Sequence, residues 1–241
     1  VSFIHPHDPY VARPEFWDLY DHDEIDLPTT QPAGGPHSLR VRAGIEADTD
    51  LVTDDEIRNA RHAYYANVSY VDSKIGEIIQ TLEEAQLLDE TIVVFTADHG
   101  EMLGERGLWY KMTMLEPSVR VPLVMAGPGI VHRAVGEPCS LVDLLPTMLD
   151  MAMGEDAWPP LGADLDGRSL LGVAGGGVED SEATAVAEYC AECTSHPIVM
   201  IRRGSKKFIW CPTDPPQLYD VVADPMELTN LADTPEFEPL V

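Results

Sequence analysis

One apolar run in this sequence ends in residues that could bind a metal ion. The run Thr91-Ile-Val-Val-Phe-Thr-Ala leads directly into Asp98, His99 and Gly100. Consecutive apolar residues are typical of a strand covered on both faces in a parallel sheet. Ligand-binding side chains in open α/β sheets lie beyond the carboxyl ends of strands, where Asp98 and His99 fall, and Gly100 permits a sharp turn. We interpret Asp98 and His99 as candidate metal ligands; the alternative is a turn-capping carboxylate beside a solvated histidine.

The elements before this run should position it. Val1–Ile4 predicts a strand that enters a loop, residues 5–10, stiffened by two prolines. Residues 11–50 are rich in Pro, Asp and Gly and predict a long excursion over the surface. Apolar residues at helical spacing predict a helix over 54–85, which the capping sequence Thr53-Asp-Asp-Glu56 begins. The predicted order is therefore a helix followed by the strand that carries the candidate ligands.

The elements after the run predict a second strand and helix, and then a smaller β-rich region. Residues 120–126 predict another buried strand and residues 141–151 a helix. We expect residues 1–153 to form an α/β core, residues 154–181 a Gly/Pro-rich connection, and residues 182–241 a small subdomain with a turn-rich tail from Asp214. Short strands are expected in that subdomain over 185–189, 197–202 and 207–210.

The strong negative charge excludes two kinds of partner. With 15 Lys and Arg against 42 Asp and Glu, the net charge is -27. A nucleic-acid backbone or an anionic membrane would repel such a surface, so we expect no nucleic-acid and no membrane partner. No apolar run approaches the ~20 residues of a membrane-spanning helix. The acidity fits either a cytoplasm of high salt, where screening weakens self-repulsion, or an ordinary acidic enzyme.

The four cysteines do not predict a zinc site. Cys190 and Cys193 form one Cys-x-x-Cys pair, but no second pair and no histidine at finger spacing accompany it. We expect reduced thiols and a cytoplasmic location.

Several motifs, in the same order along the chain, resemble the sulfatase family of the alkaline-phosphatase-like superfamily. They are Phe95–Glu105, Leu108–Lys111, Arg120–Leu123, Leu141–Thr147, Gln217–Asp220 and Asp224–Leu231. The resemblance implies an α/β sheet flanked by helices, with a small C-terminal β-rich subdomain. It also implies one divalent metal ion, usually calcium, beside a formylglycine made from cysteine or serine.

The resemblance assigns roles to four residues. Asp98 and His99 match a late pair of metal ligands; many members have Asn in the second position, so His99 leaves manganese or another ion open. Lys111 matches a lysine that contacts the sulfate ester, and His7 a histidine that hydrogen-bonds sulfate or protonates the leaving oxygen. On their own, Lys111 could be a solvated lysine, and His7 and His5 could cap a turn.

Within the family, the segments Ser2–Tyr10, Arg13–Tyr20 and Ala187–Glu192 are most similar to choline-sulfatases. The resemblance implies that Glu188 faces the choline head group, with His5, Trp109 and Tyr110 near the substrate; aromatic rings attract organic cations. The alternatives are packing roles for Trp109 and Tyr110 and a solvent-facing carboxylate at Glu188.

The family's nucleophile motif, Cys-x-Pro-x-Arg, is absent from this sequence. Cys211-Pro212 is the nearest match, and it lacks the spacing and the arginine. We expect the N-terminal part of the fold, with the formylglycine, to be missing, so that residues 1–241 alone show no sulfatase activity; the intact protein is expected to be a homo-oligomer. Two alternatives stay open: a phosphodiesterase or phosphonate monoester hydrolase of the same superfamily, and a non-catalytic remnant that binds an anion or a partner.

Overall fold

The computed structural model of the chain consists of two compact units, each formed by two separate stretches of sequence. The structure describes residues 1–29, 31–45, 52–154 and 165–235. The first unit contains Val1–Asp89 and His99–Arg120, and the second contains Glu90–Asp98 and Val121–Val241. The unit boundary therefore passes between the two candidate metal ligands. The division at residues 153 and 181 stays a prediction, and its segment 155–164 lies outside the described residues.

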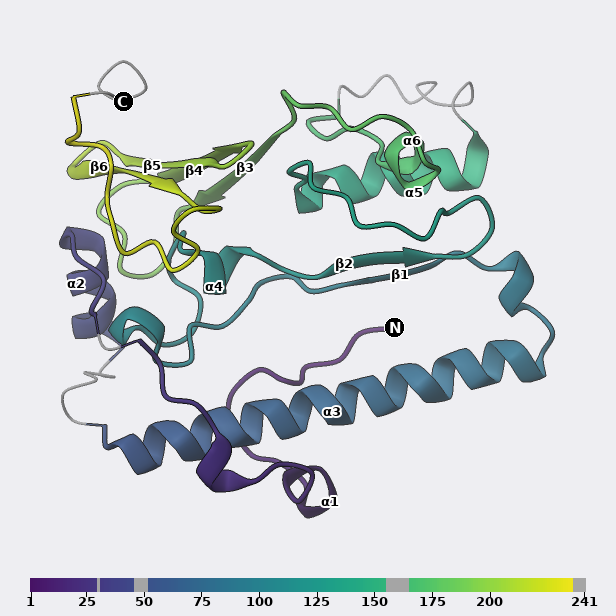
Figure 1. The fold of residues 1–241 in the computed structure, drawn as a ribbon, viewed down its shortest axis with the longest axis horizontal. Helices are drawn as coiled ribbons and strands as arrows, with labels where there is room; N and C mark the ends of the chain where they lie inside the picture. Colours follow the sequence, from purple (N-terminus) through teal and green to yellow (C-terminus); the bar gives the residue numbers. More distant parts are fainter. Residues whose placement is uncertain (30, 46–51, 155–164, 236–241) are drawn as a thin grey trace. The chain divides into compact units, whose positions relative to one another are not determined.

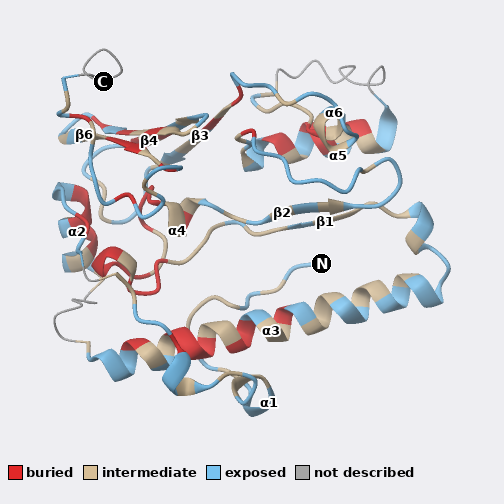
Figure 2. Ribbon diagram, in the orientation of Figure 1, coloured by how far each residue is buried: buried red, intermediate tan, exposed pale blue. Residues whose placement is uncertain are grey.

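A long helix, α3 (Asp54–Glu84), is the main element of the first unit (Figure 1). Thr53 and Glu56 form the predicted capping box: each side chain bonds the backbone N–H of the other residue. The helix buries Ile57, Ala63 and Ala66, and its buried positions gather in its N-terminal half (Figure 2). The helix predicted from the apolar spacing is therefore confirmed.

Short helices, joined by loops, make up the other described parts of the first unit. Residues 11–50, predicted as a surface excursion, include α1 (Pro14–Trp17), the 3-10 helix η1 (His22–Glu24) and α2 (Pro36–Gly44). The later stretch contains η4 (Glu105–Gly107) and α4 (Glu116–Val119). The α1 helix packs on α3 through Trp17, whose ring stacks on His62 with 3.6 Å between centroids. The strand predicted over Val1–Ile4 is wrong, because no described strand pairs with these residues.

The second unit contains a two-stranded sheet of β1 (Val93–Thr96) and β2 (Leu123–Ala126), after the 3-10 helix η3 (Leu88–Glu90) at the unit boundary. Both strands were predicted, but the predicted parallel arrangement and full burial are wrong. The pair is antiparallel, with Thr96 opposite Leu123. Phe95 is 37% exposed and Val124 57% exposed. An apolar run does not fix strand direction, since direction depends on the neighbouring strand that the chain supplies.

The second unit also contains an antiparallel sheet of four strands in sequence order. These are β3 (Thr184–Tyr189), β4 (Ile198–Arg203), β5 (Lys206–Cys211) and β6 (Asp214–Asp220). The first three were predicted. The fourth was assigned to a turn-rich tail, which is wrong: Pro215 and Pro216 lie in β6, at the sheet edge, where a missing N–H interrupts no ladder.

One buried ion pair joins this sheet to the segment after β6. Lys207 and Glu227 have side chains 0% and 1% exposed, and their charged groups lie 2.8 Å apart. Among the described residues of the unit, the remaining helices are η5 (Leu141–Asp143), α5 (Leu144–Met153) and α6 (Leu171–Ala174), so the predicted helix from Leu141 is confirmed. No helix in the described ranges combines the length and apolarity needed to cross a bilayer.

Candidate active site

The segment from His99 to Ser118 in the first unit folds back so that its two ends lie side by side. The N–H of Gly100 donates to the Ser118 carbonyl at 2.7 Å. The Ser118 hydroxyl donates in turn to the Lys111 carbonyl at 2.6 Å. A Cβ on Gly100 would lie 2.0 Å from the Pro117 carbonyl oxygen, so this closure requires glycine. The turn that follows the candidate ligands therefore anchors Lys111.

Three predicted site residues meet at this closed loop. The Nζ atom of Lys111 lies 2.5 Å from Nε2 of His7, although the two residues are 104 positions apart. The rings of His7 and His99 meet edge-on, with 5.7 Å between their centroids and a 68° angle between their planes. The structure thus brings together the residues to which the sequence assigned leaving-group, sulfate-contact and metal-ligand roles.

The partners of His7 assign the position of its proton. Its Nδ1 lies 2.9 Å from the Asp8 carbonyl oxygen and 2.9 Å from Oδ1 of the same residue. Both are acceptors, so Nδ1 carries a hydrogen and Nε2 carries a lone pair. The Lys111 ammonium donates to that lone pair. The two nitrogens therefore share one proton, while Asp8 orients the ring. This role of Asp8 was not predicted, although Asp8 directly follows His7 in the sequence.

Glu101 supports the backbone that presents Lys111. Its Oε1 accepts the N–H of Tyr110 at 2.5 Å and the N–H of Leu103 at 3.2 Å. Burial raises the pKa of Glu101, against the lowering effect of these two N–H donors. Burial and the Glu101 charge raise the pKa of Tyr10 well above its usual range, so this phenol stays neutral at physiological pH. No sequence signal separates Glu101 from the chain's many solvated acids.

Asp98 and His99 supply two donors suitable for a metal ion. The Nδ1–H of His99 donates to the Gly100 carbonyl at 2.8 Å, which leaves the lone pair on Nε2, as in metal-binding histidines. Asp98 follows β1 and is exposed. Among the described residues, no three His, Cys, Asp or Glu side chains cluster as a metal site. Two donors are fewer than the four of a zinc site or the six to eight of a calcium site, so these residues do not fit a complete centre.

The predicted substrate-binding residues lie in different environments. His5 meets Tyr70 of α3 edge-on, with 5.4 Å between ring centroids. Trp109 is 6% exposed and packs in the apolar core with Ile57, a placement that favours the packing alternative; its substrate contact stays a prediction. Tyr110 packs at the edge of that core. Glu188 is exposed on β3 of the second unit, so its role also stays a prediction.

The nearest match to the nucleophile motif does not fit a formylglycine site. Cys211 lies at the end of β5 and is 5% exposed. Its thiol is 3.6 Å from the Thr213 hydroxyl and makes a long contact with the His196 carbonyl. A buried strand residue with these partners is not presented to a substrate.

Solved structures place this arrangement in the alkaline-phosphatase-like class. A phosphonate monoester hydrolase from Silicibacter pomeroyi superposes on the chain with a TM-score of 0.78 and 26% sequence identity, over 97% of this chain and 51% of that one. The predicted α/β fold with a small C-terminal sheet is thus confirmed.

The chain belongs to the sulfatase family. The Sulfatase family matches residues 1–155, and the family described as N-sulphoglucosamine sulphohydrolase, C-terminal, matches residues 104–241. Choline-sulfatase from Rhizobium meliloti (strain 1021) is 46% identical over 241 residues, which cover 98% of this chain and 46% of that protein. Arylsulfatase K from Mus musculus is 40% identical over 195 residues, which cover 76% of this chain and 34% of that protein. The chain spans less than half the length of these curated relatives.

Proposed function

We propose that this chain forms part of a sulfatase that hydrolyses choline sulfate to choline and sulfate. The observation that carries the proposal is the contact between Lys111 Nζ and His7 Nε2 beside the His99 ring. The 46% identity to a choline-sulfatase supports choline as the alcohol.

The pair of Lys111 and His7 has the chemistry that ester cleavage needs. When the bond between sulfur and the ester oxygen breaks, its electron pair goes to the departing oxygen, which must gain a proton. The proton shared by Nζ and Nε2 would be transferred to that oxygen, and the contact of Asp8 with His7 Nδ1 would orient the ring. The other two N–H groups of the Lys111 ammonium can donate to sulfate oxygens and stabilise their charge.

Two groups of the sulfatase mechanism would join this pair. We propose that Asp98 and His99 provide two of the ligands of a divalent ion, and that the formylglycine derives from none of the four cysteines here. When bound, the ion would balance sulfate charge and the formylglycine would supply a nucleophilic hydroxyl. Because the described residues hold only part of that centre, the roles of His7 and Lys111 are derived without it.

Recognition of choline requires groups that suit a quaternary ammonium, which accepts and donates no hydrogen bonds. We propose that the Glu188 carboxylate compensates its charge, while His5 and Tyr110 provide ring surfaces.

Sulfate release from choline sulfate by the full gene product that carries these residues tests the proposal. We expect turnover with choline sulfate and at least ~100-fold lower kcat/KM with the corresponding phosphate and phosphonate monoesters. The likeness to a phosphonate monoester hydrolase makes that activity the second candidate. Preference for the phosphonate would establish it instead, and turnover of none of the esters would exclude both.

A further inference from the structure

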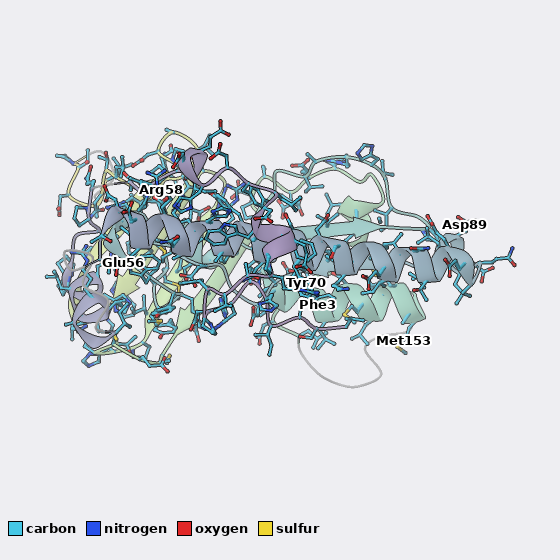
Figure 3. The ribbon with its side chains drawn as sticks, turned by 90° about the horizontal axis from the view of Figure 1, so that it is seen from below. Phe3, Glu56, Arg58, Tyr70, Asp89 and Met153 are labelled. Carbon is cyan, nitrogen blue, oxygen red and sulfur yellow. The ribbon has the colours of Figure 1, made fainter. Side chains whose placement is uncertain are left out.

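A pocket of about 350 Å³ lies beside His7 in the first unit. The loop from Ile4 to Arg13 forms one wall, and Asn67 and Tyr70 of α3 form the other; Figure 3 shows Tyr70 near the middle of this helix. Because a water molecule occupies ~30 Å³ of the liquid, the pocket has room for on the order of ten non-hydrogen atoms. A compact alcohol fits within this space, whereas an oligosaccharide would extend beyond it.

The Asn67 side chain has an unused hydrogen-bond donor at this pocket. Asn67 is 3% exposed, and its Nδ2 has no hydrogen-bond partner in the structure. Buried polar groups are nearly always paired, so an unpaired one points to a ligand or an ordered water. Asn67 and Tyr70 are three positions apart on α3, which places both on the face of the helix that lines the pocket.

The charges that line the pocket are already paired. Asp8 contacts His7 at 2.9 Å, and Arg13 contacts Glu15 at 2.7 Å. The lining residues therefore do not require a charged ligand, and the unpaired amide N–H of Asn67 can donate to an acceptor oxygen of a ligand. An ester whose bridging oxygen lies at His7 supplies such an oxygen, and its carbon chain would extend into the pocket.

We propose that this pocket binds the alcohol portion of the ester and that Asn67 is a substrate-binding residue, whose amide N–H donates to an ester oxygen. The inference rests on the proposed function and deepens it, because it limits the substrates to sulfate esters of compact alcohols.

Leucine in place of Asn67 separates substrate binding from a structural role. Asn67→Leu keeps the shape but removes the donor, so the variant should keep or raise the melting temperature, because an unpaired buried amide is lost. We expect kcat/KM of the full gene product to fall about tenfold, the value of one net hydrogen bond. The fall should be equal for choline sulfate and for its uncharged isostere, 3,3-dimethylbutyl sulfate. Asn59→Leu, at an exposed position of the same helix, is the matched control and should change neither quantity.

Two results would overturn the role of Asn67. One is an unchanged kcat/KM in Asn67→Leu, and the other is a lower kcat/KM accompanied by a lower melting temperature, which would indicate a structural role. Binding of 3,3-dimethylbutanol, followed by ligand-observed NMR, decides the question without turnover. We expect binding several-fold weaker in Asn67→Leu than in the wild-type gene product; equal binding, or none to wild type, overturns the inference. If the gene product does not hydrolyse the esters but binds 3,3-dimethylbutanol in a way that depends on Asn67, the proposed function is refuted and the pocket is still a binding site for a compact alcohol. Equal kcat/KM for choline sulfate and a sulfated disaccharide would overturn the size limit.

Discussion

Replacing Gly100 with alanine should open the loop that anchors Lys111. The added Cβ would lie 2.0 Å from the Pro117 carbonyl oxygen and 3.2 Å from that of Ser118, so the backbone must move. The movement breaks two hydrogen bonds of about 1 kcal/mol each, from the N–H groups of Gly100 and Glu101. Overpacking adds about 1–3 kcal/mol. We therefore expect the free energy of unfolding to fall by about 3–5 kcal/mol.

Calorimetry and steady-state kinetics on the gene product measure this effect. The melting temperature should fall by roughly 6–20 °C. The kcat/KM should fall on the order of 100-fold, because the loop no longer holds Lys111 against His7. Gly76→Ala in α3 is the matched control: no heavy atom lies within 4 Å of the added Cβ. Alanine should stabilise that helix by about 0.5–1 kcal/mol. Equal melting temperatures and activities in the two variants would refute the reasoning.

Three further predictions concern the second unit. Lys207→Met should lower the unfolding free energy of the second unit by about 3–5 kcal/mol, because Glu227 keeps a buried charge and loses the ammonium group that lies 2.8 Å away. Denaturant unfolding measures the change. A second substitution, Glu227→Leu, should restore most of the lost stability. The Lys206 ammonium, first among several causes, lowers the pKa of Asp220 to about 2. The resulting contribution to stability is about 1 kcal/mol after solvent screening; it is present above pH ~4 and is lost as the pH falls through that lowered pKa. In Asp220→Asn, the free energy of unfolding should therefore depend less on pH in this acid range. Glu188→Gln should lower kcat/KM about three- to tenfold for choline sulfate and leave 3,3-dimethylbutyl sulfate unaffected, because only the former carries a cation.

Each of these predictions has a contradicting result. A double variant as unstable as Lys207→Met would show that Lys207 acts other than by compensating Glu227. If the free energy of unfolding of Asp220→Asn falls as steeply as that of the wild type between pH 4 and 2, the titration of Asp220 does not contribute to the acid dependence of stability. Equal losses for both esters in Glu188→Gln would show that this carboxylate does not recognise the cation.

Local sequence predicted the elements that local rules determine. The capping box at Thr53 and Glu56 begins α3 where expected, because both partners lie within one turn. The direction of β1 was predicted wrongly, since pairing depends on a strand some thirty residues later. The β6 segment was predicted as part of a turn-rich tail, yet an edge strand tolerates the missing N–H groups of Pro215 and Pro216.

The same distinction holds for the site. Asp98 and His99 were selected from the apolar run that ends in them, whereas Lys111 and His7 were selected through a family resemblance. That family is now confirmed by the matches over the chain. The contributions of Glu101 and Asn67 could not be predicted, because a carboxylate or amide gains its role here from burial. Burial depends on which distant segments cover the side chain, and residue type alone does not specify them.

The proton held between Lys111 and His7 is the central claim, and Lys111→Met tests it most directly. The kcat/KM for choline sulfate, measured with the full gene product, should fall by about 10²- to 10⁴-fold with little change in melting temperature. Lys206→Met is the matched control, since that lysine lies on β5 of the second unit in a partly exposed ion pair with Asp220, and it should keep wild-type activity. Wild-type kcat/KM in Lys111→Met would contradict the account.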